Sequence, residues 1–207
     1  MMAKALAANG ANKVYIIGRR LEKLEAAAKE SSHGNIIPLH GDVTDKVSLE
    51  KMAAQVQREI GYIHFLVCNS GITGPLAEQL KEGASITEIQ KFMWDWDQKA
   101  FNGAFELNVT GTFFTIIAFL NLLDAGNKAQ GREDIQSSVL ITASVASFMR
   151  RLATGVAYTT SKAAEQHLAK VMGTYLAPHK IRVNSLCPGI FPSMCDMSVG
   201  MVRKRNC

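Results

Sequence analysis

The sequence has little cysteine and no pattern that would let its cysteines act together. The four are widely spaced, with no Cys-x-x-Cys pair and no nearby histidines. This spacing argues against a zinc site and against a disulfide scaffold, so no metal is expected. Cys68 and Cys187 end apolar runs, where a cysteine is usually a small buried hydrophobe.

Long apolar runs are also lacking. The most apolar stretch, residues 111–123, is interrupted by Thr112, Thr115 and Asn121. It is shorter than the roughly 18–20 residues that cross a bilayer, so a buried helix is predicted there. The residues after Met1 have no apolar core of a secretory signal. These absences favour a cytoplasmic protein that has no membrane partner.

Acidic residues are the minority, 18 against 23 basic residues, which gives a formal net charge of +5. A positive charge raises the question of nucleic acid. The basic residues are scattered among acidic ones along predicted helices, as on solvated faces. The one dense basic run, residues 203–205, has no interleaved aromatic residues. No nucleic-acid partner is therefore expected.

Short β-branched runs alternate with stretches of helical periodicity, which is typical of a parallel sheet covered by helices on both faces. This pattern predicts an α/β fold. The predicted strands are residues 13–17, 35–39, 63–68, 139–142 and 181–186. The predicted helices are residues 1–9, 21–30, 47–60, 99–123 and 157–176. Residues 72–97 are less regular, and Trp94 and Trp96 are predicted to pack in the interior.

A phenol and an ammonium, those of Tyr158 and Lys162, lie four residues apart on one face of the predicted helix 157–176. A free tyrosine has a pKa of about 10 and is a poor base at neutral pH. A cation within ~4–6 Å favours the phenolate form. The pair is therefore a candidate device for proton transfer between an alcohol and a ketone.

Two further polar residues have both a structural and a functional interpretation. Ser144 follows a predicted strand, where its hydroxyl could hydrogen-bond a substrate oxygen, or the residue could be an ordinary turn residue or a helix cap. Asn108 lies inside the predicted helix 99–123, where asparagine is unfavourable by propensity. It could serve the site, or it could bend the helix and bond to backbone.

Taken together, these residues resemble the short-chain dehydrogenase/reductase family. Asn69-Ser70-Gly71 resembles the Asn-Ala-Gly motif that follows a buried strand in this family, and Asn108-Val-Thr-Gly111 resembles its Asn-x-x-Gly helix motif. Ser144, Tyr158 and Lys162 match the catalytic residues in order and approximate spacing. Cys187-Pro188-Gly189 resembles the Pro-Gly motif after the sixth strand. The matches extend over about residues 1–194, and each is weak while the set is specific.

The resemblance implies a Rossmann-like doubly wound parallel sheet and catalytic roles for Asn108, Ser144, Tyr158 and Lys162. Tyr158 would give a proton to a carbonyl oxygen or take it back, and Lys162 would assist it and hold the nicotinamide ribose. Ser144 would orient the substrate oxygen, and Asn108 would hold a water of the proton relay. The implied substrate is a small carbonyl compound or alcohol. The implied assembly is a homodimer or homotetramer formed by the two long helices.

The resemblance also implies a nicotinamide dinucleotide site. An acidic residue directly after the second family strand would bind a ribose 2′-hydroxyl, whereas arginine suits a 2′-phosphate. Arg19 and Arg20 stand there, so NADP(H) is expected rather than NAD(H), although both could simply open a surface helix. Asp42 would contact adenine, or it could be a turn residue or a helix cap. The remaining implied cofactor contacts are Val43, Asn69, Gly71, Tyr158, Lys162, Pro188 and Gly189.

The sequence departs from the family pattern at both ends. It begins inside the helix that should follow the glycine-rich phosphate loop, and a basic tail of residues 197–207 replaces the last family strand. Residues 1–196 are expected to form a single, truncated domain. The family's first strand is central in its sheet, so its two neighbours are expected to stand ~9–10 Å apart, two strand spacings.

Three hypotheses remain open from the sequence. The first is an NADP(H)-dependent dehydrogenase/reductase, because the residues matching the catalytic set are intact. The second is a non-catalytic nucleotide-binding or regulatory remnant of the same fold, because the phosphate loop of the family is not seen. The third is an unstable fragment without function.

Overall fold

The computed structural model describes residues 1–31, 33–77, 80–81, 83–129, 135–150 and 154–189. All five predicted strands are confirmed, with ends shifted by two residues or fewer. They are β1 (Val14–Gly18), β2 (Ile36–His40), β3 (Phe65–Cys68), β4 (Ser138–Thr142) and β5 (Arg182–Leu186). The basic run of residues 203–205, the tail 197–207, Cys195 and Cys207 lie outside the described residues.

The five strands form two separate parallel sheets. β1 pairs with β2, with Val14 opposite Ile36, and β3, β4 and β5 pair in that order. No ladder joins β1 to β3 in the described part of the chain. The two neighbours of the missing family strand are therefore unpaired with each other, as expected, and the α/β class with parallel sheets is confirmed.

A cavity of about 610 Å³ lies between the two sheets. Both β1 and β3 line it, and the first turn of α1 and one face of α6 close it. Among its lining residues are Leu6, Tyr15, Ile17, Leu66, Thr112 and Phe119. The strand edges that face this cavity carry backbone amides and carbonyls without a neighbouring strand, so the sheets are held together by side chains and helices.

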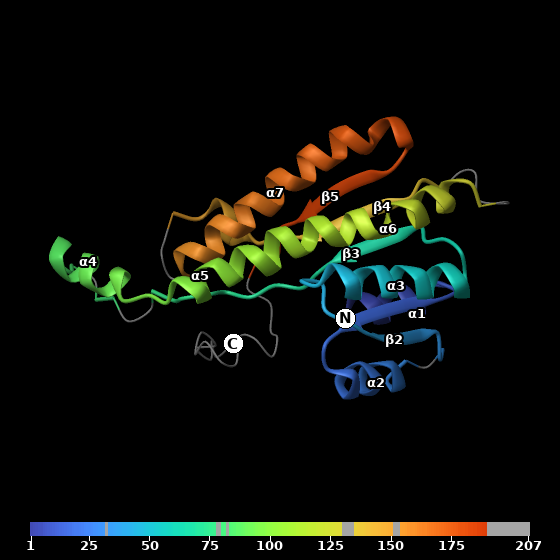
Figure 1. Ribbon diagram of the computed structural model, residues 1–207, viewed down its shortest axis with the longest axis horizontal. Helices are drawn as coiled ribbons and strands as arrows, with labels where there is room; N and C mark the ends of the chain where they lie inside the picture. The colour runs from blue at the N-terminus through green and yellow to red at the C-terminus, as the bar shows by residue number, and fades with distance from the viewer. Residues whose placement is uncertain (32, 78–79, 82, 130–134, 151–153, 190–207) are drawn as a thin grey trace, which may run out of the picture.

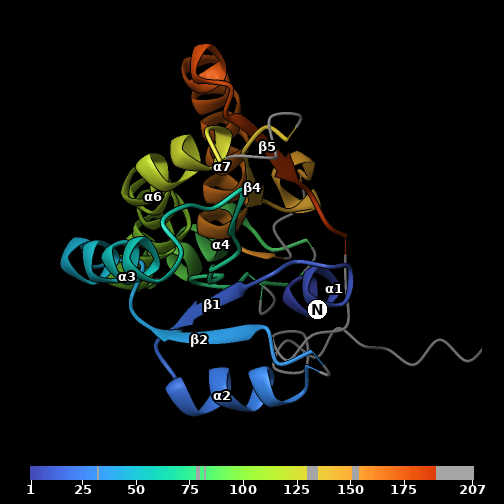
Figure 2. The same ribbon diagram turned by 90° about the vertical axis from the view of Figure 1, so that its right-hand side faces the viewer.

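Helices cover both sheets, as Figure 1 and Figure 2 show. The helices are α1 (Met2–Ala8), α2 (Leu21–Lys29), α3 (Lys46–Glu59), α4 (Ile86–Trp94), α5 (Gln98–Phe105), α6 (Thr112–Asn127) and α7 (Val156–Leu176). α1 and α2 pack on the β1–β2 sheet, α3 packs against α6, and α7 packs along β5. One cluster of buried apolar side chains joins elements of both sheets, including Leu39, Leu123 and Ile141.

The predicted long helix is a continuous run that extends farther than expected at its end. A π-helical turn, η1 (Glu106–Gly111), joins α5 to α6, so the run covers Gln98–Asn127. By length and composition alone, this helix could cross a membrane, contrary to the expectation from residues 111–123. Its side chains Ile116, Phe119 and Leu123 are buried in the protein core, as in the core helix of a globular domain.

The segment predicted to be irregular contains α4. Ser85 and Glu88 form a capping box at its start, and each side chain bonds the backbone amide of the other. α4 projects from the body of the molecule (Figure 1), and Trp94 is 85% exposed. The prediction that Trp94 packs in the interior is therefore wrong. Trp96 is half-buried and makes an edge-to-face contact with Phe92.

Candidate functional site

The predicted chemical residues gather at the carboxyl end of the β3–β4–β5 sheet. Parallel strands bring their carboxyl ends to one edge, where loops and helix starts can meet around a ligand. Cys68 ends β3 and Thr142 ends β4, so Asn69 and Ser144 follow at this edge. α7 begins beside them, because it packs against both β4 and the short helix η2 (Val145–Phe148).

Tyr158 and Lys162 lie side by side on α7. The Lys162 ammonium is 5.8 Å from the centroid of the Tyr158 ring. Tyr158 is half-buried, and Lys162 is 4% exposed. The proton-transfer hypothesis places a positive charge near the phenol, and a lysine beside the tyrosine ring is compatible with it.

The Lys162 ammonium has two further partners within the protein. It donates a hydrogen bond to the Thr142 carbonyl, with a Nζ to O distance of 2.7 Å. It also lies 2.7 Å from Oε2 of Glu165 on the next turn of α7. The first contact anchors the lysine to the end of β4, two residues before Ser144. The second gives the cation a buried counter-charge.

Ser144 caps a short helix, as its structural interpretation predicted. Its Oγ accepts a hydrogen bond from the Ala146 amide at 3.1 Å, and η2 begins at the next residue. A hydroxyl that accepts one bond can still donate its own proton. Capping therefore fixes the direction of the oxygen and is compatible with a second bond to a ligand.

Asn108 is fully buried in the π-helical turn η1, and its amide bonds to backbone. Its Oδ1 accepts from the Ile72 amide at 2.9 Å, and its Nδ2 donates to the Ile72 carbonyl at 3.0 Å and to Ser161 Oγ at 2.9 Å. These bonds tie the loop after β3 to α7. The same turn places the asparagine where a regular helix would not, and such π turns are frequent at functional sites.

Gly71 allows these groups to come together. A Cβ atom placed on Gly71 would lie 3.2 Å from both Asn108 Oδ1 and Lys162 Nζ. Either side chain would have to move to admit it. Gly71, Asn108 and Lys162 are therefore neighbours in the structure, as the site prediction required.

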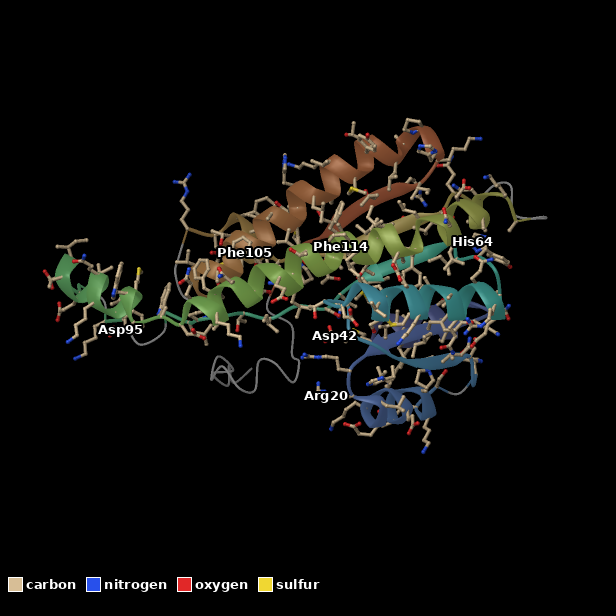
Figure 3. All side chains as sticks on the ribbon, in the orientation of Figure 1. Arg20, Asp42, His64, Asp95, Phe105 and Phe114 are labelled. Carbon is tan, nitrogen blue, oxygen red and sulfur yellow. The ribbon has the colours of Figure 1, made fainter. Side chains whose placement is uncertain are left out.

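A second group of predicted residues lies at the carboxyl end of the β1–β2 sheet (Figure 3). Arg19 follows β1, and its guanidinium is 3.8 Å from the Asp42 carboxylate and mostly exposed. Arg20 is exposed and is the residue before α2, as its structural interpretation predicted. Hydrogen bonds from the Thr44 backbone amide and hydroxyl to its carboxylate hold the pKa of Asp42 below its usual value and form a local turn.

The other predicted cofactor contacts lie close to these two groups. Val43 lines the cavity between the sheets. Its carbonyl lies close to Gly111 of the long helix, since a Cβ atom placed on Gly111 would be 3.2 Å from the carbonyl oxygen. Asn69 also lines this cavity. The Pro188 carbonyl accepts from the Val145 amide at 2.9 Å, which places the Pro188-Gly189 segment beside Ser144.

Sequence reasoning missed Glu165, which is 1% exposed and contacts Lys162. A signal was present, since Tyr158, Lys162 and Glu165 have the spacing i, i+4 and i+7 that shares one helix face. It also missed Ser161, which bonds Asn108. Cys68 behaves as predicted, because burial raises the pKa of its thiol to about 12 and keeps it neutral.

Comparison with known proteins gives consistent results. Residues 1–203 match the family described as short chain dehydrogenase. The short-chain dehydrogenase/reductase PhomF' of Diaporthe leptostromiformis is 45% identical over 98% of this chain and 68% of its own length.

Two solved structures have the same fold. The RhlG/NADP active-site complex of Pseudomonas aeruginosa superposes with a TM-score of 0.76 at 25% identity, over 95% of this chain and 69% of that one. NAD+-bound xylitol dehydrogenase superposes with a TM-score of 0.74 at 26% identity, over 94% of this chain and 67% of that one.

The family match covers nearly the whole chain, and this agrees with a parallel α/β fold whose strand ends gather a tyrosine, a lysine and a serine. The chain therefore belongs to the short-chain dehydrogenase/reductase family of nicotinamide-dependent oxidoreductases.

Proposed function

We propose that this chain is an NADP(H)-dependent oxidoreductase that interconverts a small carbonyl compound and a secondary alcohol. The observation that carries the proposal is the pair on α7, in which the Lys162 ammonium is 5.8 Å from the Tyr158 ring. This pair stands beside Ser144 at the end of β4, through the bond from Lys162 to the Thr142 carbonyl.

In the proposed reduction, the Tyr158 hydroxyl donates its proton to the substrate oxygen, and the Lys162 cation stabilises the phenolate that remains. Ser144 donates a hydrogen bond to the same oxygen from its fixed position. In the oxidation, the phenolate accepts the proton of the alcohol. The nicotinamide dinucleotide, when bound, supplies or accepts the hydride.

The described residues fit the two ends of such a cofactor. Arg19 and Arg20 are exposed cations at the end of the β1–β2 sheet, which suits a ribose 2′-phosphate. Asn69 and Gly71 follow β3, and Lys162 of α7 lies beside Gly71, which suits the nicotinamide end. Between them, the described part of the chain offers no glycine-rich turn that opens a helix toward a diphosphate.

Fluorescence titration of the purified chain with NADPH tests the proposal. Saturable binding, followed by NADPH oxidation with aldehydes or ketones, is the expected result. Failure to bind at millimolar cofactor, by a chain with a cooperative thermal melt, would contradict it.

A non-catalytic nucleotide-binding or regulatory role is the second candidate. Lys162 is 4% exposed and already engaged by Thr142 and Glu165, so its ammonium is less available to a ribose. Binding of NADPH without turnover of any carbonyl compound would favour this role.

Cofactor preference is expected to depend on the two arginines. Replacing both Arg19 and Arg20 by alanine should weaken NADPH binding about 10–100-fold, because one bond to a charged group contributes ~1.5–3 kcal/mol and solvent screening leaves the second exposed arginine with little to add. NADH binding should change less than threefold, since it lacks the 2′-phosphate. Lys23→Ala removes one exposed charge from α2, the helix that follows the two arginines, and is the matched control. An unchanged preference for NADPH in the double variant would remove the reason for proposing NADP(H).

We further propose that residues 1–196 form one domain, that the protein is cytoplasmic, and that it assembles as a homodimer or homotetramer through its long helices. Exposed apolar side chains on α6 and α7, Ile117 and Val171, support an interface there. Light scattering coupled to gel filtration tests the assembly, and a monomer at micromolar concentration would contradict it.

A further inference from the structure

A buried carboxylate stands behind the tyrosine and lysine pair. Glu165 is 1% exposed and lies one turn beyond Lys162, on the same face of α7. Acidic side chains are almost never fully buried unless they are paired. None of the proposed proton-transfer steps uses this residue, so its burial beside Lys162 calls for a role.

Two groups lie against this carboxylate, one from its own helix and one from α6. The Lys162 ammonium lies 2.7 Å from Oε2, and the Thr112 hydroxyl, at the start of α6, lies 3.5 Å from Oε1. The charge of Glu165 adds to the effect of burial in raising the pKa of the Cys68 thiol at the end of β3. Burial raises the pKa of Glu165 to about 7, although Lys162 and Thr112 act in the opposite direction. No other charged group of the described chain shifts this pKa.

The charge on Glu165 changes how strongly the Lys162 ammonium stabilises the Tyr158 phenolate. An ammonium favours a nearby phenolate because it is a positive charge in a site of low dielectric. When Glu165 is ionised, the ion pair is neutral overall and the effect on the phenol is partly cancelled. When Glu165 is protonated, the full charge of Lys162 acts on Tyr158. The same contact also holds the lysine at the Thr142 carbonyl.

We propose that Glu165 is a positioning residue that acts through Lys162, holding the ammonium at the end of β4 and moderating how strongly it favours the Tyr158 phenolate. The proposal rests on the proposed function of the pair. Proton transfer by Tyr158 would then depend on the charge of Glu165, which contacts neither substrate nor cofactor.

Phenolate absorbance near 295 nm tests this without turnover. The titration of Tyr158 is obtained as the difference between each protein and the same protein carrying Tyr158→Phe. Glu165→Gln keeps the shape and removes the charge. The midpoint of the Tyr158 titration should fall, because removing a negative charge behind Lys162 favours the phenolate. Glu165→Leu tests the same loss of charge with a different side chain, should the glutamine variant fold poorly.

Glu50→Gln is the matched control, because it removes an exposed carboxylate from α3. It should leave the Tyr158 midpoint unchanged. A midpoint that stays the same in folded Glu165→Gln and Glu165→Leu would overturn the proposal.

Kinetics add a second readout. The wild-type profile of kcat/KM against pH should contain an inflection near pH 7 that Glu165→Gln lacks. An inflection that persists in the variant would contradict the role of Glu165. If the Tyr158 titration moves as expected and no protein turns over a carbonyl compound, the oxidoreductase proposal fails and the role of Glu165 stands.

Discussion

Replacing Tyr158 by phenylalanine is expected to lower kcat about 10²–10⁴-fold, the usual contribution of a positioned acid or base. The variant keeps the ring that packs beside Lys162 and loses only the hydroxyl that carries the proton. Affinity for NADPH should change less than twofold, since the ring remains in place. Steady-state kinetics and nicotinamide fluorescence measure the two quantities.

Tyr175→Phe provides the control for this experiment. Tyr175 lies on the same helix and is 79% exposed, so removing its hydroxyl should leave turnover within twofold of wild type. Near-normal activity in Tyr158→Phe would rule out the proposed proton donor.

Gly155→Ala is expected to lower the free energy of unfolding by about 2–4 kcal/mol, a large effect for one methyl group. Gly155 precedes α7 with φ at 79° and ψ at 149°, a backbone conformation that is essentially restricted to glycine. A Cβ atom there would lie 2.2 Å from the Pro75 carbonyl oxygen, so the loop or the helix must move. Urea unfolding measures the change. Activity should fall as well, because Tyr158 is only three residues away.

Gly34→Ala separates the two causes. Gly34 also has a positive φ, 62°, but nothing lies within 4 Å of a Cβ atom placed on it. Gly34→Ala should lower the free energy of unfolding by only about 1 kcal/mol, the strain of the left-handed conformation. If Gly155→Ala and Gly34→Ala lower the free energy of unfolding by the same amount, the contact with Pro75 has no effect on stability.

Much of the fold could be predicted because apolar periodicity reports burial directly. The fully apolar run before Asn69 became β3, and the β-branched runs became strands with nearly the predicted ends. α4 could have been found as well, because Ser85 and Glu88 have the spacing of a capping box. The prediction for Trp94 failed since aromatic residues are usually buried, whereas α4 projects from the rest of the chain.

The candidate site was predicted in part. The sequence placed Tyr158 and Lys162 on one helix face, and Ser144 and Asn69 at strand ends. It could not predict the π-helical turn at Asn108, because a local change in backbone hydrogen bonding does not alter the apolar periodicity of the sequence. Glu165 was missed for a different reason. A lone acidic residue in a helix usually belongs to a solvated face, and only the packing of α6 against the same region makes this one interior.

The cavity between β1 and β3 has a mechanical consequence for ligand binding. Arg19 and Arg20 follow the β1–β2 sheet, and Tyr158 and Lys162 lie on α7, which packs against the β3–β4–β5 sheet. No backbone ladder joins the two sheets in the described part of the chain. A ligand that contacts both the arginines and Lys162 would link the two sheets. Part of its binding free energy would be used to restrict the movement of one sheet relative to the other. Substitutions that strengthen the packing between the sheets would therefore raise the affinity for this ligand without contacting it.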